Sequence, residues 1–424
     1  MGRDREIKKL NTLYQDEGFQ FVVIYGRRRV GKTMLINEFL KGKRSAYYMA
    51  VEGTAKENLT GISKTLLTEG VSDFYMPEFS DFESLLLYID HLCKNSDGQE
   101  RLVIAIDEFP YLAASYPAIS SMLQSHIDQC WKNSNLFLIL CGSSMSFMEE
   151  QVLGYKSPLY GRRTAQFKLH PFSYFEAKEM LSEFSTEEQA VLYGVTGGIP
   201  EYLSRIRSNQ SMDDNIKELF FDESGRLFDE PGNFLNQELQ DPSSYHSIIT
   251  AIAGGASRLN EIATKTGLAS SGCSAQIQSL ITLGIIKKET PLTEGIKSRK
   301  TLYQLEDFMF LFWYRFVRPN LSGIMRGIGE TIYEVSVKPQ ISHFMGYIFE
   351  EICKQYLYLP QIYMTLPFPA GEFARWWGNN PKKKRQEEID LMAENGLEAI
   401  FGECKWRNEL ADVDILETLQ ERSG

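Results

Sequence analysis

The sequence has few cysteines, no long apolar run and no excess of basic residues. Its six cysteines are scattered, without a C-x-x-C pair or the spacing of a zinc site, so we expect reduced thiols in a cytoplasmic protein. No stretch approaches the length of a membrane-spanning helix, and residues 1–10 are too charged for a signal peptide. The formal net charge of −11 argues against a protein with a broadly basic surface for nucleic acid, although local basic patches could still bind nucleic acid.

A complete phosphate-binding motif, G-x-x-x-x-G-K-[ST], follows the apolar run 21–25. The motif consists of Gly26, Arg27, Arg28, Arg29, Val30, Gly31, Lys32 and Thr33. The apolar run predicts a buried strand, and a helix is expected from Met34, the last nucleotide-binding position, to Leu40. In this setting backbone N–H groups converge on the β-phosphate, Lys32 reaches the β- and γ-phosphates, and Thr33 offers its hydroxyl to Mg²⁺. The motif therefore predicts that the chain binds a nucleoside triphosphate.

A second nucleotide motif is the apolar run 102–106, which ends in two carboxylates. Asp107, at the end of the predicted strand, can hold the Mg²⁺ that bridges the phosphates. Glu108 is placed to orient or deprotonate the attacking water. A core strand that runs into an acidic loop is common in isolation, but the upstream phosphate-binding loop favours the catalytic interpretation.

Two further polar positions have weaker signals. Ser143 follows the strand predicted at 136–141, where it could touch the γ-phosphate or, equally, cap the next helix. Arg162 could stabilise transition-state charge within the chain or across a subunit contact, which makes a second copy of the chain a candidate partner. Arginines of this kind more often form surface salt bridges.

Strands and helices alternate from residue 21 to about 177, which predicts an α/β fold with a parallel sheet covered by helices on both faces. Besides the three runs above, strands are expected at 46–51 and 166–169. From about 171 the pattern becomes helical, and 245–305 shows short helices followed by a hairpin. We interpret the chain as an ATPase core at 1–175, a helical lid and connector at 176–240, a winged helix at 241–320 and a last α/β domain at 335–424.

Together these motifs resemble the prokaryotic, largely archaeal, P-loop ATPase family of the STAND/AAA-like group, fused to a C-terminal domain of unknown function. The motifs G-R-R-R-V-G-K-T, I-D-E-F-P-Y and C-G-S-S all look like family motifs. The resemblance implies ATP or ADP with Mg²⁺ as cofactors, and Arg3, in a G-R-x-x-E segment, lying against the adenine. Gly198–Ile199–Pro200 is similar to the G-x-P motif, through which Pro200 would let a helical lid sense the nucleotide.

The order of elements in 258–305 predicts a winged helix: a helix, a turn at Gly267, a second helix at 270–283, then a hairpin. The candidate recognition helix, 270–279, presents serines and glutamines rather than basic residues. Cations for phosphate contacts come only from the wing, through Lys287, Lys288, Lys297, Arg299 and Lys300. Winged helices also serve as internal lids in STAND-type proteins, and we place that role slightly ahead of DNA contact.

The C-terminal region predicts a hairpin that gathers charged residues. If Asn395–Gly396 is a two-residue turn, Asp390 faces Phe401, and Asp390, Glu403 and Lys405 share one face of the sheet. Such a group suits Mg²⁺ binding by Asp390 and Glu403 and polarisation of a scissile phosphate. The alternative is a salt-bridged, exposed sheet face without catalysis.

This D…E-x-K arrangement resembles the PD-(D/E)XK nuclease superfamily, with its restriction-endonuclease-like fold. Glu350, in a helix predicted at 344–356, matches the helical acid of that fold. The basic run 381–385 could meet a nucleic-acid backbone or form a solvated loop. The chain ends soon after the helix expected at 412–422, where the fold normally adds another strand, so the resemblance implies a truncated domain.

Three functions are compatible with these motifs. The first is an ATPase switch that controls a nuclease-like domain acting on nucleic acid. The second is a nucleotide-gated DNA-binding regulator, and the third is a signalling scaffold without nucleic acid. The complete set Glu350, Asp390, Glu403 and Lys405 favours the first, whereas the acidic charge and the polar recognition helix count against the second.

Overall fold

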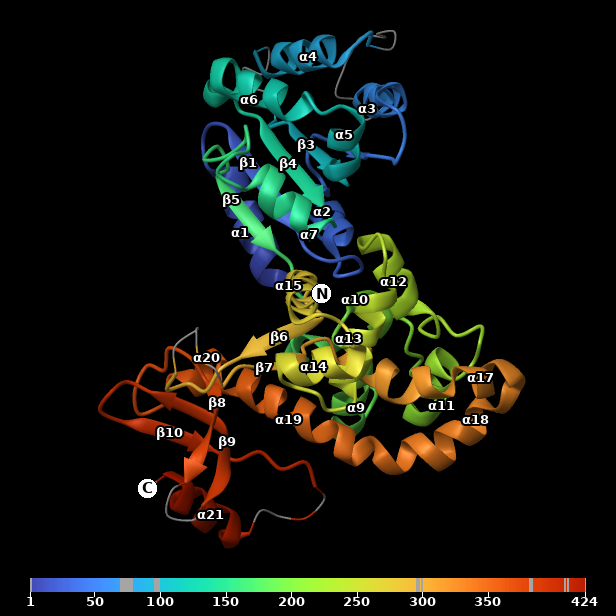
Figure 1. Ribbon diagram of the computed structural model, residues 1–424. Helices are drawn as coiled ribbons and strands as arrows, with labels where there is room; N and C mark the ends of the chain where they lie inside the picture. Colours follow the sequence, from blue (N-terminus) through green and yellow to red (C-terminus); the bar gives the residue numbers. More distant parts are fainter. Residues whose placement is uncertain are drawn as a thin grey trace. The chain divides into compact units, whose positions relative to one another are not determined.

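A computed structural model describes residues 2–68, 79–94, 100–294, 298, 300–380, 384–407, 409 and 412–423. The chain forms two compact units, Met1–Pro171 and Phe172–Gly424 (Figure 1). Within the described ranges, none of the six cysteines forms a disulfide, and no helix is both long and apolar enough to cross a bilayer. The predicted division of the chain into four domains stays an interpretation.

The first unit is built on a five-stranded parallel sheet with the strand order β2-β3-β4-β1-β5. The strands are β1 (Gln20–Tyr25), β2 (Ser45–Met49), β3 (Val103–Asp107), β4 (Phe137–Gly142) and β5 (Ala165–Lys168). Every residue of β1, β3 and β4 is buried, as expected for parallel strands with helices on both faces (Figure 1). The predicted α/β fold is confirmed, and each predicted strand is found within one or two residues of its expected bounds.

Helices cover this sheet and close its core (Figure 1). They are α1 (Asp4–Gln15), α2 (Lys32–Leu40), α3 (Ala55–Thr68), α4 (Phe82–Lys94), α5 (Phe109–Ser115), α6 (Ile119–Gln129) and the single turn α7 (Met145–Phe147). Phe39 of α2 packs on Phe137 of β4 with ring centroids 5.2 Å apart. This contact buries the helix that follows the phosphate-binding loop against the centre of the sheet, which fixes the position of the loop.

The second unit begins with helices around α9, whose residues 190–196 are all buried. These helices are α8 (Tyr174–Met180), α9 (Thr186–Thr196), α10 (Pro200–Leu203), α11 (Met212–Phe220) and α12 (Glu230–Glu238). Capping boxes at Ser173 and Ser185 start α8 and α9, with each serine hydroxyl accepting from the backbone N–H three residues later.

Three helices and a hairpin follow, in the order predicted for a winged helix. They are α13 (Ser243–Ala253), α14 (Leu259–Thr266), α15 (Ser270–Thr282), β6 (Ile286–Glu289) and β7 (Leu302–Leu305). Gly267 ends α14 with φ 71°, a left-handed conformation that favours glycine. Strands β6 and β7 pair antiparallel, and Lys297 and Arg299 of the loop between them lie outside the described residues.

The last part of the second unit combines a long helix with a three-stranded antiparallel sheet, in the order β10-β9-β8. Its elements are α16 (Phe308–Phe312), α17 (Leu321–Gly323), α18 (Gly329–Ile332), α19 (Ile341–Leu357), α20 (Pro360–Tyr363), β8 (Ala374–Asn380), β9 (Arg385–Glu394), β10 (Ala399–Gly402) and α21 (Val413–Ser423). Of the predicted basic run, residues 381–383 lie outside the described ranges, and Lys384 is exposed.

The register predicted for the β9–β10 hairpin is wrong by two residues. Gly402 pairs with Leu391, so Glu403 lies directly across from Asp390 rather than diagonal to it. The turn residues are Gly396 and Leu397, because the side chain of Asn395 accepts the backbone N–H groups of Leu397 and Glu398 at 2.9 and 2.8 Å. Gly396, at φ 87°, occupies the first turn position, as in type II′ turns. A shift by two leaves the predicted faces unchanged.

Gly198 is a position at which only glycine fits, which gives a test of the fold. Its φ is 67°, and an added Cβ would lie 2.3 Å from the carbonyl oxygen of Phe172. Gly267 has nearly the same φ of 71° but no atom within 4 Å of the added Cβ. Gly267→Ala should therefore lower the free energy of unfolding by about 1 kcal/mol through φ alone, and Gly198→Ala by a further ~1–3 kcal/mol through the clash.

Denaturant unfolding of the two variants, followed by a probe in the second unit, measures the difference between them. Equal losses of stability would show that the close approach of Gly198 to Phe172 is absent in solution.

Candidate functional site

The phosphate-binding loop connects β1 to the N-terminus of α2, and its backbone requires two glycines. Gly31 precedes α2 with φ 91°, and a Cβ on Gly26 would lie 2.4 Å from the carbonyl oxygen of Leu169. Arg29 also adopts a left-handed conformation, with φ 71°. The first N–H groups of a helix have no partner within it, so the loop and the start of α2 form an anion-binding site.

Lys32 lies folded inside the loop. Its Nζ donates to the carbonyl oxygens of Gly26 and Arg27 at 2.9 and 3.0 Å, and the residue is only 6% exposed. Burial lowers the pKa of the Lys32 ammonium, and the carboxylates of Glu108 and Asp107 act in the opposite direction. An anionic phosphate at the loop would offset the same desolvation, which agrees with the predicted role of Lys32.

The side chain of Asp107 accepts three hydrogen bonds within the site. Its Oδ2 accepts the hydroxyls of Thr33 and Tyr47 at 2.7 and 2.8 Å, and its Oδ1 accepts the backbone N–H of Glu108 at 2.9 Å. Hydroxyl and carboxylate oxygens are the hard ligands that Mg²⁺ prefers, so this donor set fits the predicted metal. Tyr47 was not predicted, although its place near the end of the neighbouring strand β2 is a usable signal.

Glu108 and Ser143 are brought together by the strand order. Strand β4 lies between β1 and β3, so Ser143, just after β4, lies between the phosphate-binding loop and the carboxylates. The Ser143 hydroxyl donates to Oε2 of Glu108 at 2.8 Å, and its backbone N–H approaches the same oxygen at 3.3 Å. Glu108 has φ 50°, a strained value for a residue with a side chain. Contact of Ser143 with the nucleotide stays a prediction.

Arg3 and Met34 flank the loop. The Arg3 guanidinium donates to the carbonyl oxygen of Val30 at 2.9 Å and also to that of His170, just after β5. Arg3 thus ties the start of α1 to both the loop and the sheet, and its contact with adenine stays a prediction. Met34 is 62% exposed on α2, and Arg28 of the loop donates to the Tyr111 hydroxyl at 2.9 Å.

The guanidinium of Arg162 forms a bidentate pair with a neighbouring carboxylate. Its Nε and Nη2 donate to the two oxygens of Asp128 at 2.9 and 2.7 Å, and its Nη1 donates to the carbonyl of Pro158 at 2.8 Å. A role at the phosphates would require this bidentate pair to open, and it stays a prediction. Pro200, in the second unit, begins α10 directly after the Gly197–Gly198 turn, and its sensing role is likewise a prediction.

The predicted C-terminal charges are gathered in the structure. The Nζ of Lys405 lies 2.6 Å from Oε1 of Glu403 and 3.7 Å from Oδ2 of Asp390. The backbone N–H of Cys404 donates to the same Asp390 oxygen at 2.8 Å, and Arg422 pairs with Glu403 at 3.2 Å. Burial raises the pKa of Asp390, and the nearby Glu403 carboxylate adds to this.

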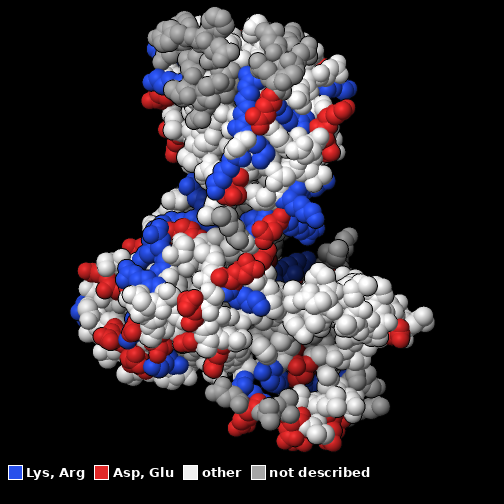
Figure 2. Space-filling model, turned by 180° about the vertical axis from the view of Figure 1, so that it is seen from behind, with Lys and Arg blue, Asp and Glu red and all other residues white. Residues whose placement is uncertain are grey.

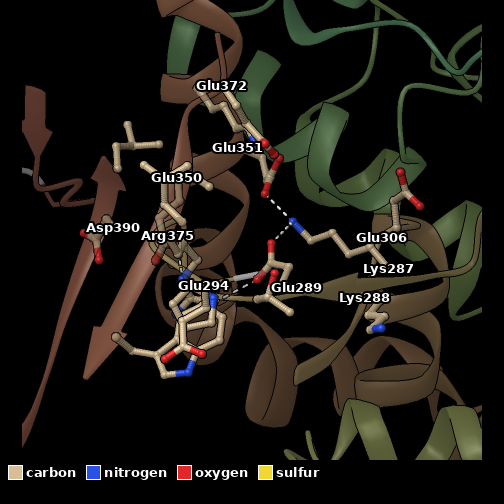
Figure 3. A pocket seen from close by; sticks show the side chains of 17 residues that line it. Lys287, Lys288, Glu289, Glu294, Glu306, Glu350, Glu351, Glu372, Arg375 and Asp390 are labelled. Carbon is tan, nitrogen blue, oxygen red and sulfur yellow. Dashed lines mark hydrogen bonds and ion pairs between the residues drawn. The ribbon is translucent and has the colours of Figure 1, made fainter. Parts of the chain in front are cut away.

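Glu350 and Asp390 line one pocket of about 390 Å³, between the β6–β7 hairpin, α19 and the β8–β9 strands (Figure 3). Burial raises the pKa of Glu350 to about 7; Arg375 opposes this rise, and the Asp390 and Glu388 carboxylates reinforce it. Within the described part of the chain, Oε2 of Glu350 has no hydrogen-bond partner. Glu403 and Lys405 do not line this pocket, so the four predicted residues fall into two adjoining groups.

Arg375, which was not predicted, is the cation nearest to Glu350. Its Nε lies 3.6 Å from Oε2 of Glu350 and its Nη1 lies 3.7 Å from Oε2 of Glu289, while its Nη2 pairs with Glu388. Arg375 comes from β8 and Glu289 from β6. The guanidinium therefore connects the hairpin to the acids of the C-terminal sheet.

The wing lysines expected to meet DNA phosphates are partly engaged inside the protein. Lys287 lies 2.5 Å from Glu351 of α19 and 2.7 Å from Glu289 (Figure 3), and Lys300 lies 2.6 Å from Glu294. Each of these two cations is already paired with a carboxylate, and their contact with DNA phosphates stays a prediction.

Comparisons with known proteins agree with this arrangement. Residues 1–206 match a family described as an ATPase domain predominantly from Archaea, and residues 313–418 match a family of archaeal and bacterial proteins of unknown function. An uncharacterized protein of Methanocaldococcus jannaschii is 34% identical over 417 residues, which cover 97% of this chain and 88% of the relative. The chain belongs to this family of predominantly archaeal ATPases. It is a nucleotide-binding P-loop ATPase.

Two further similarities concern parts of this ATPase. An uncharacterized ATP-binding protein of the same organism is 41% identical over 44 residues, covering 10% of this chain and 75% of the relative. The solved structure of a Walker-type ATPase of Pyrococcus abyssi is 19% identical, covers 74% of this chain and 95% of its own, and superposes with a TM-score of 0.56. At this identity the similarity shows a shared fold.

Substitutions at Lys32 and Glu108 should separate binding from turnover. Lys32→Ala is expected to abolish ATP binding, because the loop loses the buried ammonium that reaches the phosphates. Glu108→Gln should keep binding and lower hydrolysis ~10²-fold or more, because an amide cannot accept a proton from water. Binding of a fluorescent ATP analogue and release of phosphate measure the two effects.

Glu38→Gln on the outer side of α2 is a matched control, because Glu38 pairs only with Lys41 at the surface among its described contacts. It should leave both readouts unchanged. Equal hydrolysis rates in Glu108→Gln and the unaltered protein would contradict the role assigned to Glu108.

Proposed function

We propose that this ATPase is a Mg²⁺-dependent molecular switch that hydrolyses ATP and controls a winged helix and a nuclease-like site, which acts on or responds to nucleic acid. The observation that carries the proposal is the hydrogen-bonded chain Thr33–Asp107–Glu108–Ser143 beside the loop that holds Lys32. It supplies, in one place, a metal-binding pair, a general base and a polar group that positions the base.

Each residue has a chemical task in this mechanism. Mg²⁺, where bound, would be held by Thr33 and Asp107 and would neutralise phosphate charge. The loop N–H groups and Lys32 bind the phosphate oxygens and hold the γ-phosphate in line with water. Glu108 accepts the proton of the attacking water, which requires its carboxylate to turn from Ser143 toward the γ-phosphate. Water then forms the new P–O bond as the bond to ADP breaks.

The nuclease-like part of the proposal is supported by the charge distribution around Asp390. Two carboxylates lie close to Lys405, and burial raises the pKa of Asp390, so the site gains by receiving a cation. Asp390 and Glu403 would be the metal ligands, with Glu350 close by and Lys405 facing the scissile phosphate. The competing interpretation is a purely structural cluster, in which Lys405 and Arg422 already neutralise Glu403.

The coupling part of the proposal is supported by the shared pocket of Figure 3. Lys287 and Glu289 belong to the winged helix, yet they hold Glu351 and Arg375 of the C-terminal region. A displacement of the hairpin would therefore change the charges that surround Glu350. This link favours the internal-lid role of the winged helix over direct DNA contact.

Nucleic acid remains the proposed partner of the C-terminal site, and the cytoplasm the proposed location. On the face seen in Figure 2, basic and acidic side chains are interspersed. A nucleic acid would therefore meet short basic stretches between acidic ones, and its binding should weaken steeply with salt. A second copy of the chain is a further proposed partner, through Arg162.

Metal binding tests the C-terminal site. Mn²⁺ should raise the melting temperature of the second unit in the unaltered protein but not in Asp390→Ala, because the variant loses a ligand of the ion. Cleavage of single- or double-stranded DNA in the presence of Mn²⁺ should vanish in Lys405→Ala while the thermal shift persists. Lys384→Ala, which removes an exposed cation of the same region, is the control for the thermal shift. A thermal shift of the same size in Asp390→Ala would refute the metal site.

A comparison of the ADP-bound and ATP-bound states tests the proposed molecular switch. ADP and a non-hydrolysable ATP analogue should give different scattering profiles and different proteolysis patterns, because only the analogue offers a γ-phosphate to Lys32 and Glu108. Pro200→Ala should reduce the difference, since the proposed lid contact is lost. Identical profiles in both nucleotide states would reject the coupling without affecting ATP hydrolysis itself.

A further inference from the structure

Three side chains of different chemistry converge in the first unit, on helices α4 and α6. Asp90 lies on α4, His126 lies in the last turn of α6, and Cys130 directly follows that helix. One ligand atom of each lies within 4.8 Å of the other two. We propose that Asp90, His126 and Cys130 form a binding site for zinc or a chemically similar transition-metal ion.

The ligand types decide which ion fits. An imidazole nitrogen, a thiolate sulfur and a carboxylate oxygen are the three ligands that Zn²⁺ uses in proteins. Mg²⁺ and Ca²⁺ prefer oxygen ligands throughout, so this cluster differs in kind from the Thr33–Asp107 pair. Three protein ligands leave one tetrahedral position, which a water molecule can fill.

The two helices explain why the cluster has no recognisable sequence spacing. His126 and Cys130 are four residues apart, which places both on one face at the end of α6. Asp90 comes from another helix, 36 residues from His126 in the chain. Only the packing of α4 against α6 brings the carboxylate to the other two ligands.

The surrounding contacts are those of an oriented metal site. The Nδ1 of His126 faces Asp90 at 3.0 Å, and its Nε2 lies 3.6 Å from a carboxylate oxygen of Glu83. The indole N–H of Trp131 donates to Oδ1 of Asp90 at 2.5 Å. In metal sites the second nitrogen of a ligand histidine commonly donates to a carboxylate, and ligand carboxylates are themselves hydrogen-bonded. Nδ1 is therefore the coordinating atom.

Hydrogen bonding alone explains part of this cluster. Asp90, 5% exposed, needs donors, and His126 and Trp131 supply them. A metal ion would use all three side chains and would link α4 to α6, and the resulting stabilisation of the first unit would rise with the logarithm of the ion concentration above its Kd.

Co²⁺ is the probe that separates the two explanations, because cobalt–thiolate bonds give a charge-transfer band that oxygen and nitrogen ligands do not. The full chain should bind one Co²⁺ with this band, and Zn²⁺ should displace it. Cys130→Ser should lose the band, and His126→Asn should weaken Co²⁺ binding at least tenfold. ATP binding reports that each variant is folded, since none of these residues belongs to the nucleotide site.

Two matched thiol controls locate the signal. Cys93→Ser removes the thiol of α4, and Cys404→Ser removes the thiol beside Asp390 in the second unit. Both variants should keep the band and the rise in melting temperature that Zn²⁺ causes in the unaltered chain. Absence of the band in the unaltered chain, or its persistence in Cys130→Ser, would overturn the proposal.

Discussion

The buried carboxylate of Asp107 is the group on which the nucleotide half of this ATPase depends. It is 1% exposed, and a buried charge is costly unless donors surround it. The three donors come from the start of α2, from β2 and from the backbone of Glu108. A single desolvated charge therefore fixes the helix of the phosphate-binding loop, a neighbouring strand and the backbone of the proposed base.

Buried carboxylates of the second unit also need compensating partners, and there the partners are cations rather than hydroxyls. Glu350 and Asp390 are largely buried, and burial raises the pKa of both. Arg375 and Lys405 supply positive charge, yet Arg375 divides its guanidinium among carboxylates from two strands and a helix, Glu289, Glu388 and Glu350. Glu350 therefore remains incompletely compensated, which distinguishes it from a carboxylate in an ordinary surface salt bridge.

The parts of the fold that sequence could predict are those set by local pattern. The strands and the loop around Lys32 follow from apolar runs and from a motif whose residues are adjacent in the chain. Tyr47 and Arg375 were not predicted, because their partners lie far away in sequence; for Tyr47 the one sequence signal is its place near the end of a strand. The β9–β10 register was wrong because the Asn395 side chain accepts two backbone N–H groups, which moves the turn by one residue.

The same reasoning explains why the proposed switch has its output at the β6–β7 hairpin. Lys287 and Glu289 belong to β6, and both have charged partners in the pocket lined by Glu350 and Asp390. If the nucleotide moves the hairpin, the charge around Glu350 changes, and linkage requires the reverse effect as well. A cation bound at Glu350 would compete with Arg375 for that carboxylate and so change how strongly Arg375 pairs with Glu289. The pocket lined by Glu350 and Asp390 would then influence nucleotide affinity even if it cleaved no nucleic acid. Natural selection could therefore maintain the electrostatic link independently of catalysis.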